Sequence, residues 1–340
     1  MTMLLTLGTF NLNNLFSRWN LYLEVLGERQ QVPSWLEEGA HGANEITIDV
    51  TDDAEGPRWH WRRFAGQNVY GKTPEAQQEV ARRLLAGNAD VWALQEVESE
   101  SALHDFCDGY GLTDAGYVHR VCLPGNDPRL INVGLISRYP LGPVTSWRFL
   151  TDPADPSRPV FSRDLLQVEV RTPGEAQRLL TVFVTHLKSQ LARTPAELAA
   201  ATERRHSQAL AISKIITRLG GAEGLGAFAL LGDMNAAPDD ASLSPICEAG
   251  LELPLRGARE DHPYDPRDTS QPATPAWTHR YKPSGQPAQY LLYDQIWLPP
   301  AVATSVTDAW ILRRSHREGD GSDHDPALLR LELTAIPLPT

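Results

Sequence analysis

The stretch FALLGDMNAAPDD (228–240) passes from a wholly apolar run into a polar turn within a few residues. A continuous apolar run of this kind is typical of a central strand that is buried on both faces. Gly232 permits the chain to bend, and Asp233 and Asn235 follow at once. We therefore predict a buried strand over 228–232 that delivers a carboxylate and an amide at its end.

Four other apolar segments also carry polar groups at or just beyond one end. These groups are Asn11 and Asn13 after LTLGTF, Glu96 after DVWALQ, His186 and Lys188 in LTVFVTHLK, and Asp323 and His324 directly before ALLRLEL. Each motif on its own is more often a solvated strand end or an ordinary turn. Their common position, and the single chemistry to which their residue types belong, favour one shared site where the strand ends meet.

This set of side chains suits a hard cation and phosphate chemistry. It contains carboxylates as oxygen ligands or bases (Glu96, Asp233, Asp323), imidazoles as acid–base groups (His186, His324) and amides as neutral donors (Asn11, Asn235). Mg²⁺ takes a few carboxylates and keeps sites for water and phosphate, whereas zinc prefers more His or Cys. Hydrolysis of a phosphate ester needs neutralised charge and an aligned water. The pattern therefore predicts a Mg²⁺ or Mn²⁺ phosphoesterase site.

Composition limits the class of partner and the compartment. The chain of 340 residues has a formal net charge of -12, which argues against a broad basic surface that wraps nucleic acid but allows a local cationic cleft. Its three cysteines form no disulfide framework. The N-terminal apolar run has no basic flank and is too short to span a membrane. We expect a cytoplasmic protein without a membrane span, and a monomer.

The hydrophobic pattern predicts one α/β domain over 1–340. Strands are expected at 4–10, 90–95, 132–137, 164–171, 179–185, 228–232, 294–298 and 327–333. Helices are expected from Thr73 to Gly87 and from Thr194 to Gly220, each with Thr at the N-cap and Pro next. Long irregular loops are expected at about 17–72, 148–163 and 252–290.

Some polar residues are better explained without a functional role. Arg204, Arg205 and Gln208 on the second helix are interpreted as a solvated face, and Asp325 as a turn residue. The aromatic and basic cluster RWHWRRF (58–64) is interpreted as packing of a long loop, with stacking on a nucleic acid strand as the alternative.

Seven blocks together resemble the endonuclease/exonuclease/phosphatase superfamily of metal-dependent phosphoesterases. The blocks are TFNLNNLF (9–16), LQEVE (94–98), NVGLISRYPL (132–141), THLKSQ (185–190), LLGDMNAAPDD (230–240), YDQIWL (293–298) and GSDHDPAL (321–328). Their order matches that of the family, and their sequences are most similar to those of the bacterial nuclease-like branch. The resemblance implies a four-layer α/β sandwich, in which two packed mixed β-sheets are flanked by helices.

The resemblance also implies a role for each candidate residue. Glu96, Asp323 and Asn13 would bind the metal, although many members carry an acidic residue where this chain has Asn13. The catalytic set would be His324 paired with Asp294, Asp233 and Asn235 on the attacking water, and His186 on the phosphate or leaving group. Asn11, Arg129, Arg163 and Lys188 would bind substrate. For the two arginines, a structural ion pair is an equal alternative.

These features favour a metal-dependent phosphodiesterase, specifically a nuclease that cuts DNA or RNA by in-line attack of water with Mg²⁺ or Mn²⁺. The segment DPRLIN (127–132) lacks the Tyr that abasic-site nucleases use near the phosphate, which weakens that reading. One alternative is a phosphatase or phospholipase that acts on a small-molecule or lipid phosphate. A non-enzymatic binding protein that kept the fold is the third, and the near-complete polar set argues against it.

Overall fold

The computed structural model describes residues 2–16, 72–153, 155–174, 177–192, 194–263, 271–281, 285–314 and 321–337, and four short strands between 23 and 61. Those strands are β2 (Leu23–Val25), β3 (Glu28–Gln30), β4 (Ile48–Asp53) and β5 (Gly56–Trp61). β2 pairs with β3 and β4 with β5, both antiparallel. The side chains of the 58–64 cluster lie outside the described residues.

The first large sheet has seven strands in the order β15-β19-β20-β1-β6-β8-β7. They are β1 (Thr2–Leu15), β6 (Val91–Val97), β7 (His119–Cys122), β8 (Asn132–Ser137), β15 (Arg259–Glu260), β19 (Val306–Ile311) and β20 (Ala327–Thr334). The long central strand β1 runs antiparallel to β20 and parallel to β6. The carboxyl ends of β1 and β6 and the start of β20 therefore lie at the same edge of the sheet.

The second large sheet has the order β18-β14-β13-β12-β9, with β21 paired to β13. Its strands are β9 (Leu141–Ser146), β12 (Leu165–Arg171), β13 (Gln177–His186), β14 (Phe228–Asp233), β18 (Asp294–Trp297) and β21 (Ile336–Pro337). β13 and β14 are parallel, and β18 is antiparallel to β14. The carboxyl ends of β13 and β14 thus meet the start of β18.

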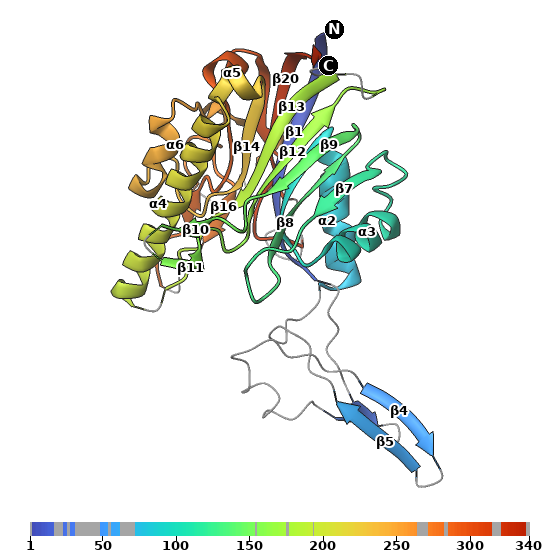
Figure 1. Ribbon diagram of the computed structural model, residues 1–340. Helices are drawn as coiled ribbons and strands as arrows, with labels where there is room; N and C mark the ends of the chain where they lie inside the picture. The colour runs from blue at the N-terminus through green and yellow to red at the C-terminus, as the bar shows by residue number, and fades with distance from the viewer. Residues whose placement is uncertain are drawn as a thin grey trace.

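Helices cover the outer faces of both sheets, as Figure 1 shows. α2 (Pro74–Gly87) and α3 (Glu100–Gly109) lie on one side, and α4 (Pro195–Arg218), α5 (Gly221–Leu225) and α6 (Ser244–Glu248) on the other. Further short helices are η1 (Ala241–Leu243), η2 (Pro254–Gly257) and α7 (Pro300–Ala303). The predicted four-layer α/β sandwich of two mixed sheets is confirmed.

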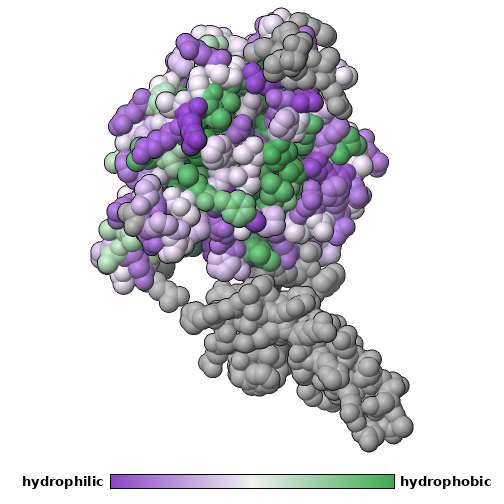
Figure 2. Space-filling model, viewed as in Figure 1, coloured by the Kyte–Doolittle hydropathy of each residue, from purple (hydrophilic) through white to green (hydrophobic). Residues whose placement is uncertain are grey.

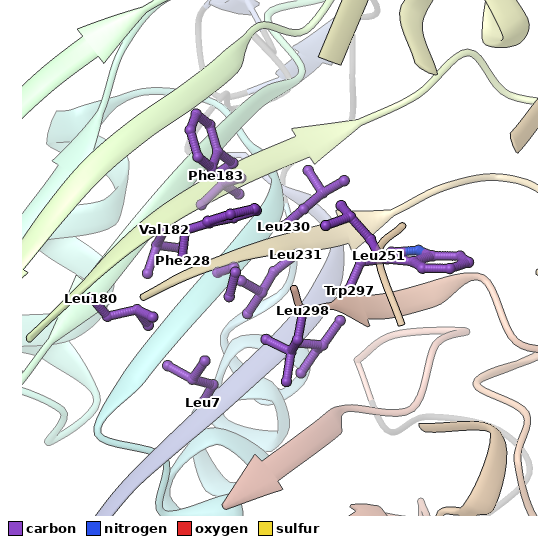
Figure 3. Close-up of a cluster of buried hydrophobic side chains, with 14 of the residues drawn as sticks. Leu7, Leu180, Val182, Phe183, Phe228, Leu230, Leu231, Leu251, Trp297 and Leu298 are labelled. Carbon is purple, nitrogen blue, oxygen red and sulfur yellow. The ribbon is translucent and has the colours of Figure 1, made fainter. Parts of the chain in front are cut away.

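Apolar side chains from both sheets form the central core. Figure 3 shows Leu7 of β1 among side chains of β13 and β14, and Trp297 at the far side of the same cluster. The rings of Phe183 and Phe228 meet edge to face at 6.1 Å. A second core lies between the first sheet and α2 and α3, and it includes the buried Trp92. Burial on both faces explains why these strands read as continuous apolar runs.

The predicted helix starts are confirmed, but one helix face was misjudged. Thr194 and Glu197 form a capping box at the start of α4, as the sequence pattern suggests. Arg205 and Gln208, predicted to be solvated, are instead buried. Arg205 donates to the backbone oxygen of Lys188 at 3.1 Å, and the Gln208 side chain accepts from the backbone N–H of Lys188 at 2.9 Å. These contacts satisfy the backbone just beyond β13, where no neighbouring strand does.

All three predicted irregular loops contain short strands, and β2 to β5 lie in 17–72. β10 (Thr151–Asp152) and β11 (Asp155–Pro159) lie in 148–163, whereas β15, η2 and β16 (His279–Tyr281) lie in 252–290, with β17 (Gln289–Leu291) at its end. The interpretation as wholly irregular was wrong because strands this short show no alternating apolar pattern. Strands β7, β9 and β19 and helix α3 were missed for a similar reason.

On the face in Figure 2, small groups of hydrophobic residues lie among hydrophilic ones. Within the described part of the chain, no helix is long and apolar enough to cross a membrane.

Candidate active site

Neighbouring strands of the second sheet place three predicted residues directly opposite one another in the strand register. In the register of β13, β14 and β18, His186 pairs with Asp233, and Asp233 pairs with Asp294. Gly232 permits this approach, because a Cβ at that position would lie 1.9 Å from the backbone oxygen of Thr185. Its φ of 147° also disfavours any side chain. Strand register thus accounts for the convergence that the sequence pattern suggests.

One carboxylate oxygen of Asp233 stands at the centre of the site. Its Oδ2 atom accepts a hydrogen bond from Asn11 Nδ2 at 2.9 Å, which links the two sheets. The Nε2 atoms of His186 and His324 lie 3.5 and 3.9 Å from the same oxygen. Asp233 Oδ1 accepts the backbone N–H of Asn235 at 2.8 Å. Burial raises the pKa of Asp233 despite the opposing charge of His324, so this carboxylate takes up a proton more readily than usual.

A second carboxylate holds the imidazole of His324 from behind. Asp294 Oδ2 lies 2.6 Å from His324 Nδ1, and both residues are buried. Thr278 Oγ1 accepts the backbone N–H of Asp294 at 2.9 Å and so fixes the start of β18. Burial alone would lower the pKa of His324, but Asp294 and two further carboxylates outweigh it and raise the pKa to about 10. His324 is therefore positively charged at neutral pH, with Nε2 on the side of Asp233.

Glu96 lies near the carboxyl end of β6 among amide groups. Its Oε2 accepts the backbone N–H of Asn14 at 2.9 Å, and Oε1 lies 3.4 Å from Asn11 Nδ2. Burial raises the pKa of Glu96, and the charge of His324 opposes this only in part. A partly buried carboxylate that accepts hydrogen bonds from neutral amide groups is available to a cation, which is the property expected of a metal ligand.

The backbone at the site is strained. Glu96 has a φ of 63°, and Asn13, Asn14 and Asn235 have φ values of 48°, 63° and 50°. Asn tolerates the left-handed region, but Glu adopts it rarely. Four of the seven non-glycine residues with positive φ in the described part of the chain thus adjoin one site. Strain of this kind concentrates where function requires a fixed side-chain position.

A serine connects the two remaining metal-ligand candidates, Asn13 and Asp323, through their neighbours. Ser322 Oγ donates to the backbone oxygen of Asn11 at 2.7 Å and accepts the backbone N–H of His324 at 3.1 Å. The backbone N–H of Asn13 donates to Asn11 Oδ1 at 2.9 Å. The side chain of Asp323 is exposed next to this junction. The end of β1 and the segment before β20 are therefore held together.

Arginine side chains line the side of the site beyond β13. Arg163 is buried, and its Nη1 donates to the backbone oxygen of Leu187 at 2.9 Å, which also accepts Asn235 Nδ2 at 3.1 Å. Arg163 Nε donates to Asp127 Oδ2 at 3.1 Å. Arg129 holds the same carboxylate through Nε and Nη2 at 3.0 and 2.9 Å. Both arginines therefore form structural ion pairs, which place two guanidinium groups beside the site.

These guanidinium groups affect the two remaining predicted residues on β13 and beyond it. Burial, reinforced by Arg163, lowers the pKa of His186 well below its usual value, so His186 is neutral at pH 7. Burial, together with Arg163 and Arg129, also lowers the pKa of Lys188. The structure thus brings together carboxylates on one side of Asp233 and cationic side chains on the other.

Sequence reasoning missed four residues at the site: Lys72, Thr278, His279 and Ser322. The Lys72 ammonium donates to the backbone oxygen of Gly321. Burial lowers the pKa of Lys72 to about 8, although nearby carboxylates oppose this. Thr278 and His279 lie in the predicted loop 252–290, and Ser322 lies in the block GSDHDPAL without a role assigned to it. No sequence pattern identifies Lys72.

Asp325 is a buried ion-pair centre rather than a turn residue. Its carboxylate lies 2.6 Å from Arg83 Nη2 of α2, 3.1 Å from Arg313 Nη1 and 3.1 Å from Arg314 Nε. Burial opposes its ionisation, but the three guanidinium groups outweigh this and hold the pKa of Asp325 below its usual range. The interpretation as a turn was wrong because the three arginines lie in other segments of the chain, on α2 and just after β19. The cluster anchors the segment that carries His324.

We expect Asp325→Asn to lower the free energy of unfolding by about 3–5 kcal/mol, because it removes the buried carboxylate that three guanidinium groups share. Urea unfolding followed by circular dichroism measures this. The matched control is Asp239→Asn, which removes an exposed pair with Arg256 and should cost at most about 1 kcal/mol. Equal losses in the two variants would contradict an anchoring role for Asp325.

Comparison with known proteins shows the family to which the chain belongs. The endonuclease/exonuclease/phosphatase family profile matches residues 65–324. The chain is a member of this family. Members of the endonuclease/exonuclease/phosphatase family are phosphoesterases that act on phosphate esters, including nucleic acids, and typically use divalent metals. No curated protein matches the chain by sequence.

Solved structures share the fold at low sequence identity. A Bacteroides vulgatus endonuclease/exonuclease/phosphatase has a TM-score of 0.58 and 14% identity, and the match covers 98% of this chain and 100% of that one. TDP2 from C. elegans has a TM-score of 0.53 and 14% identity, with 97% and 75% covered. The human nocturnin catalytic domain, with a bound sulfate, has a TM-score of 0.51 and 17% identity, with 78% and 88% covered.

The residues at the site fit the divalent metal that the family typically uses. Glu96 offers a partly buried carboxylate whose hydrogen bonds come from the amides of Asn11 and Asn14, and Asp323 and Asn13 offer further oxygen atoms nearby. Carboxylate and amide oxygens are the donors that Mg²⁺ and Mn²⁺ prefer. The exposed position of Asp323 leaves room for the waters that Mg²⁺ retains.

Proposed function

We propose that the protein is a metal-dependent phosphodiesterase that hydrolyses DNA or RNA by in-line attack of water. One observation carries the proposal: the buried His324–Asp294 pair faces the carboxylate of Asp233, with Glu96 hydrogen-bonded to the same Asn11 side chain. The stability of the fold does not require these three groups to lie together: a charged imidazole, a carboxylate of raised pKa and a carboxylate that can bind a metal. Phosphoester hydrolysis needs all three.

The proposed roles follow from the protonation states. Asp233 accepts the proton of the attacking water, because its raised pKa makes it a better base than an exposed Asp. Asn235, held by the backbone oxygen of Leu187, orients that water. His324 donates from Nε2 to a phosphate oxygen, while Asp294 fixes its ring and stabilises its charge.

Neutral and cationic side chains complete the site. His186, which is neutral, donates a hydrogen bond to the phosphate or the leaving oxygen. Asn11 donates its amide to Asp233 and substrate. Glu96, Asp323 and Asn13 would hold Mg²⁺ or Mn²⁺, which when bound neutralises charge on the phosphate oxygens. The proton of the attacking water is thus assigned to Asp233, and the hydrogen bonds to the phosphate and the leaving oxygen are assigned to the two histidines.

The cationic side of the site favours a polyanionic substrate. Arg129, Arg163 and Lys188 supply local positive charge in a chain whose formal net charge is -12. Such a local field attracts a phosphate backbone without a broad basic surface. The acidic surface elsewhere favours the second candidate, a phosphatase or phospholipase that acts on a small-molecule or lipid phosphate.

A substrate panel tests the proposal. We expect the protein to cleave plasmid DNA or RNA with Mg²⁺ or Mn²⁺, and to lose all activity when EDTA removes the metal. The panel adds a generic phosphodiester, phosphomonoesters and phospholipid vesicles, and its control protein is the double variant Asp294→Asn/His324→Gln. Turnover of monoesters or lipids alone would replace the nuclease by the second candidate. Absence of metal-dependent turnover on every substrate would reject the enzyme.

A further inference from the structure

The imidazole of His279, at the start of β16, has no role in the chemistry proposed above. Its ring stacks on Tyr293 with centroids 5.2 Å apart and an interplanar angle of 12°. The ring of His324 lies 4.7 Å away on a neighbouring segment, to which His279 is also joined by an isolated β-bridge. His279 Nε2 lies 3.6 Å from Asp323 Oδ2. Two imidazoles and one carboxylate therefore meet at the edge of the active site.

We propose that His279, Asp323 and His324 form a binding site for a Zn²⁺-type ion, and that this ion inhibits the enzyme. One ligand atom from each of these residues lies within 4.8 Å of the other two. Imidazole nitrogen is a ligand for Zn²⁺ and related transition metals, whereas Mg²⁺ prefers oxygen. The site therefore differs in metal preference from the oxygen donors of Glu96 and Asn13.

One of the three separations is close to that of tetrahedral coordination, and the three ligand atoms lie within 4.8 Å of one another, so the ligands must draw closer to bind an ion. Zinc bonds to His nitrogen and carboxylate oxygen are about 2.0–2.1 Å long, so two ligands of a tetrahedral ion lie about 3.4 Å apart. The distance of 3.6 Å between His279 Nε2 and Asp323 Oδ2 is close to that value. Three protein ligands leave a fourth position for water, and Asp323 is exposed enough to admit it.

The orientation of His324 is that of a metal ligand. Its Nδ1 atom is hydrogen-bonded to Asp294 Oδ2 at 2.6 Å, which leaves Nε2 as the atom available to a cation. A carboxylate behind the ring is the usual support of a zinc-bound histidine, because it fixes the tautomer and increases the basicity of the ligand. Stacking on Tyr293 orients the ring of His279 in the same way.

Inhibition follows because His324 is both a ligand of the proposed zinc site and a catalytic residue of the proposed function. This part of the inference rests on the proposed function. An ion on Nε2 releases to water the proton that this nitrogen carries at neutral pH, and so prevents His324 from donating to a phosphate oxygen. It also engages Asp323, which the proposed Mg²⁺ site shares. Zinc binding itself does not depend on the identity of the substrate, so binding and inhibition are measured separately.

Isothermal titration of the metal-free protein with ZnCl₂ tests the site. The unaltered protein should bind one ion, and so should Glu96→Gln, which changes the oxygen site alone. His279→Phe keeps an aromatic ring against Tyr293 but should weaken binding at least about 100-fold, since loss of a direct ligand costs no less than loss of its support. His262→Asn is the matched control, because His262 lies in an exposed pair with Asp261. It should bind zinc normally.

Two outcomes would overturn the proposal: equal zinc affinity in His279→Phe, or loss of binding in Glu96→Gln alone, which would put the ion on the oxygen donors. His279→Asn serves as a second variant, and circular dichroism checks that both remain folded. Titration of the unaltered protein with Co²⁺ gives an independent readout, since coordination by imidazole in a tetrahedral site produces intense visible absorption. Spectra of a six-coordinate oxygen site would equally contradict the proposal.

Activity at saturating Mg²⁺ tests inhibition. Micromolar ZnCl₂ should inhibit the unaltered protein and His262→Asn. For His279→Phe, the rate measured with zinc is divided by the rate of the same variant without zinc. This ratio should stay near one. If zinc binds through His279 but leaves the ratio unchanged in the unaltered protein, the inhibitory role is wrong. If the protein has no activity at all, the proposed function fails while the calorimetric result still decides the zinc site.

Discussion

Replacement of His324 by glutamine is expected to lower kcat by about 10²–10⁴-fold, the usual contribution of a positioned acid–base group. Glutamine is similar in length and keeps a donor, but it carries no charge and cannot exchange a proton. The loss should appear in kcat more than in KM, because the charge of His324 acts on negative charge that develops in the transition state. Steady-state kinetics with Mg²⁺ on the best substrate of the panel measures this.

Stability must be followed in the same variant because Asp294 is buried behind His324. Removal of the imidazolium leaves that carboxylate without its partner and lowers the free energy of unfolding. The folded pKa of His324, about 10, exceeds the value of about 6.5 expected in the unfolded chain. The stability from this pair is therefore fully present below pH 6.5 and is lost as the pH rises through 10. The stability difference between the two proteins should shrink in that window.

The double variant Asp294→Asn/His324→Gln separates chemistry from folding. It removes both charges, so it should recover much of the lost stability while kcat remains as low as in His324→Gln, because the two residues act as one unit. His206→Gln, on the exposed side of α4, is the matched control and should change neither quantity. If the double variant regained activity together with stability, His324 would be a structural residue and not a catalytic one.

The layers of the fold could be predicted from sequence because buried positions of a strand or helix are occupied by apolar residues. β14 is covered on both faces, so FALL reads as a continuous apolar run, whereas β20 alternates because one face is partly exposed. Helix starts could also be predicted, because the capping box of Thr194 and Glu197 satisfies the backbone N–H groups at the start of α4 by contacts that are local in sequence. Strands such as β15, with two residues, carry no such mark. Their place depends on partners far along the chain.

The candidate site could be predicted from the sequence only where its residues lie at strand ends. Asp233 and His186 follow apolar runs directly, and register then places them side by side. Asp325 shows where this reasoning stops: its neighbours in sequence suggest a turn, whereas its function depends on three arginines from other segments. Contacts of this kind leave no local pattern. Lys72 was missed for the same reason.

Glu96→Gln is expected to abolish activity and yet to stabilise the metal-free protein. Loss of the metal ligand should lower kcat at least about 10³-fold, because a bound metal supplies several kcal/mol of transition-state stabilisation. Burial raises the pKa of Glu96, so the folded protein binds its proton more tightly than the unfolded chain does. Above the folded pKa, the ionised carboxylate therefore lowers stability, and a neutral amide removes this cost.

Thermal and urea unfolding with EDTA and with Mg²⁺ distinguishes the two effects. In EDTA at pH 7, Glu96→Gln should be more stable than the unaltered protein by about 0.5–2 kcal/mol, the usual range for stabilising substitutions. Added Mg²⁺ at about 100 times its Kd should stabilise the unaltered protein by about 2.7 kcal/mol and leave the variant unchanged. Glu169→Gln, which removes a partly exposed pair with Arg171, is the control and should respond to Mg²⁺ normally.

The opposite signs of these two effects make Glu96 a sharper test than loss of activity alone. A structural glutamate would lose stability on substitution, whether or not metal is present, because its hydrogen bonds from Asn14 and Asn11 would weaken. A metal ligand whose charged carboxylate is desolvated in the metal-free protein is expected to do the reverse, because a neutral amide removes the cost of that charge. A variant that is both inactive and less stable in EDTA would therefore assign Glu96 to the structure and move the metal site elsewhere.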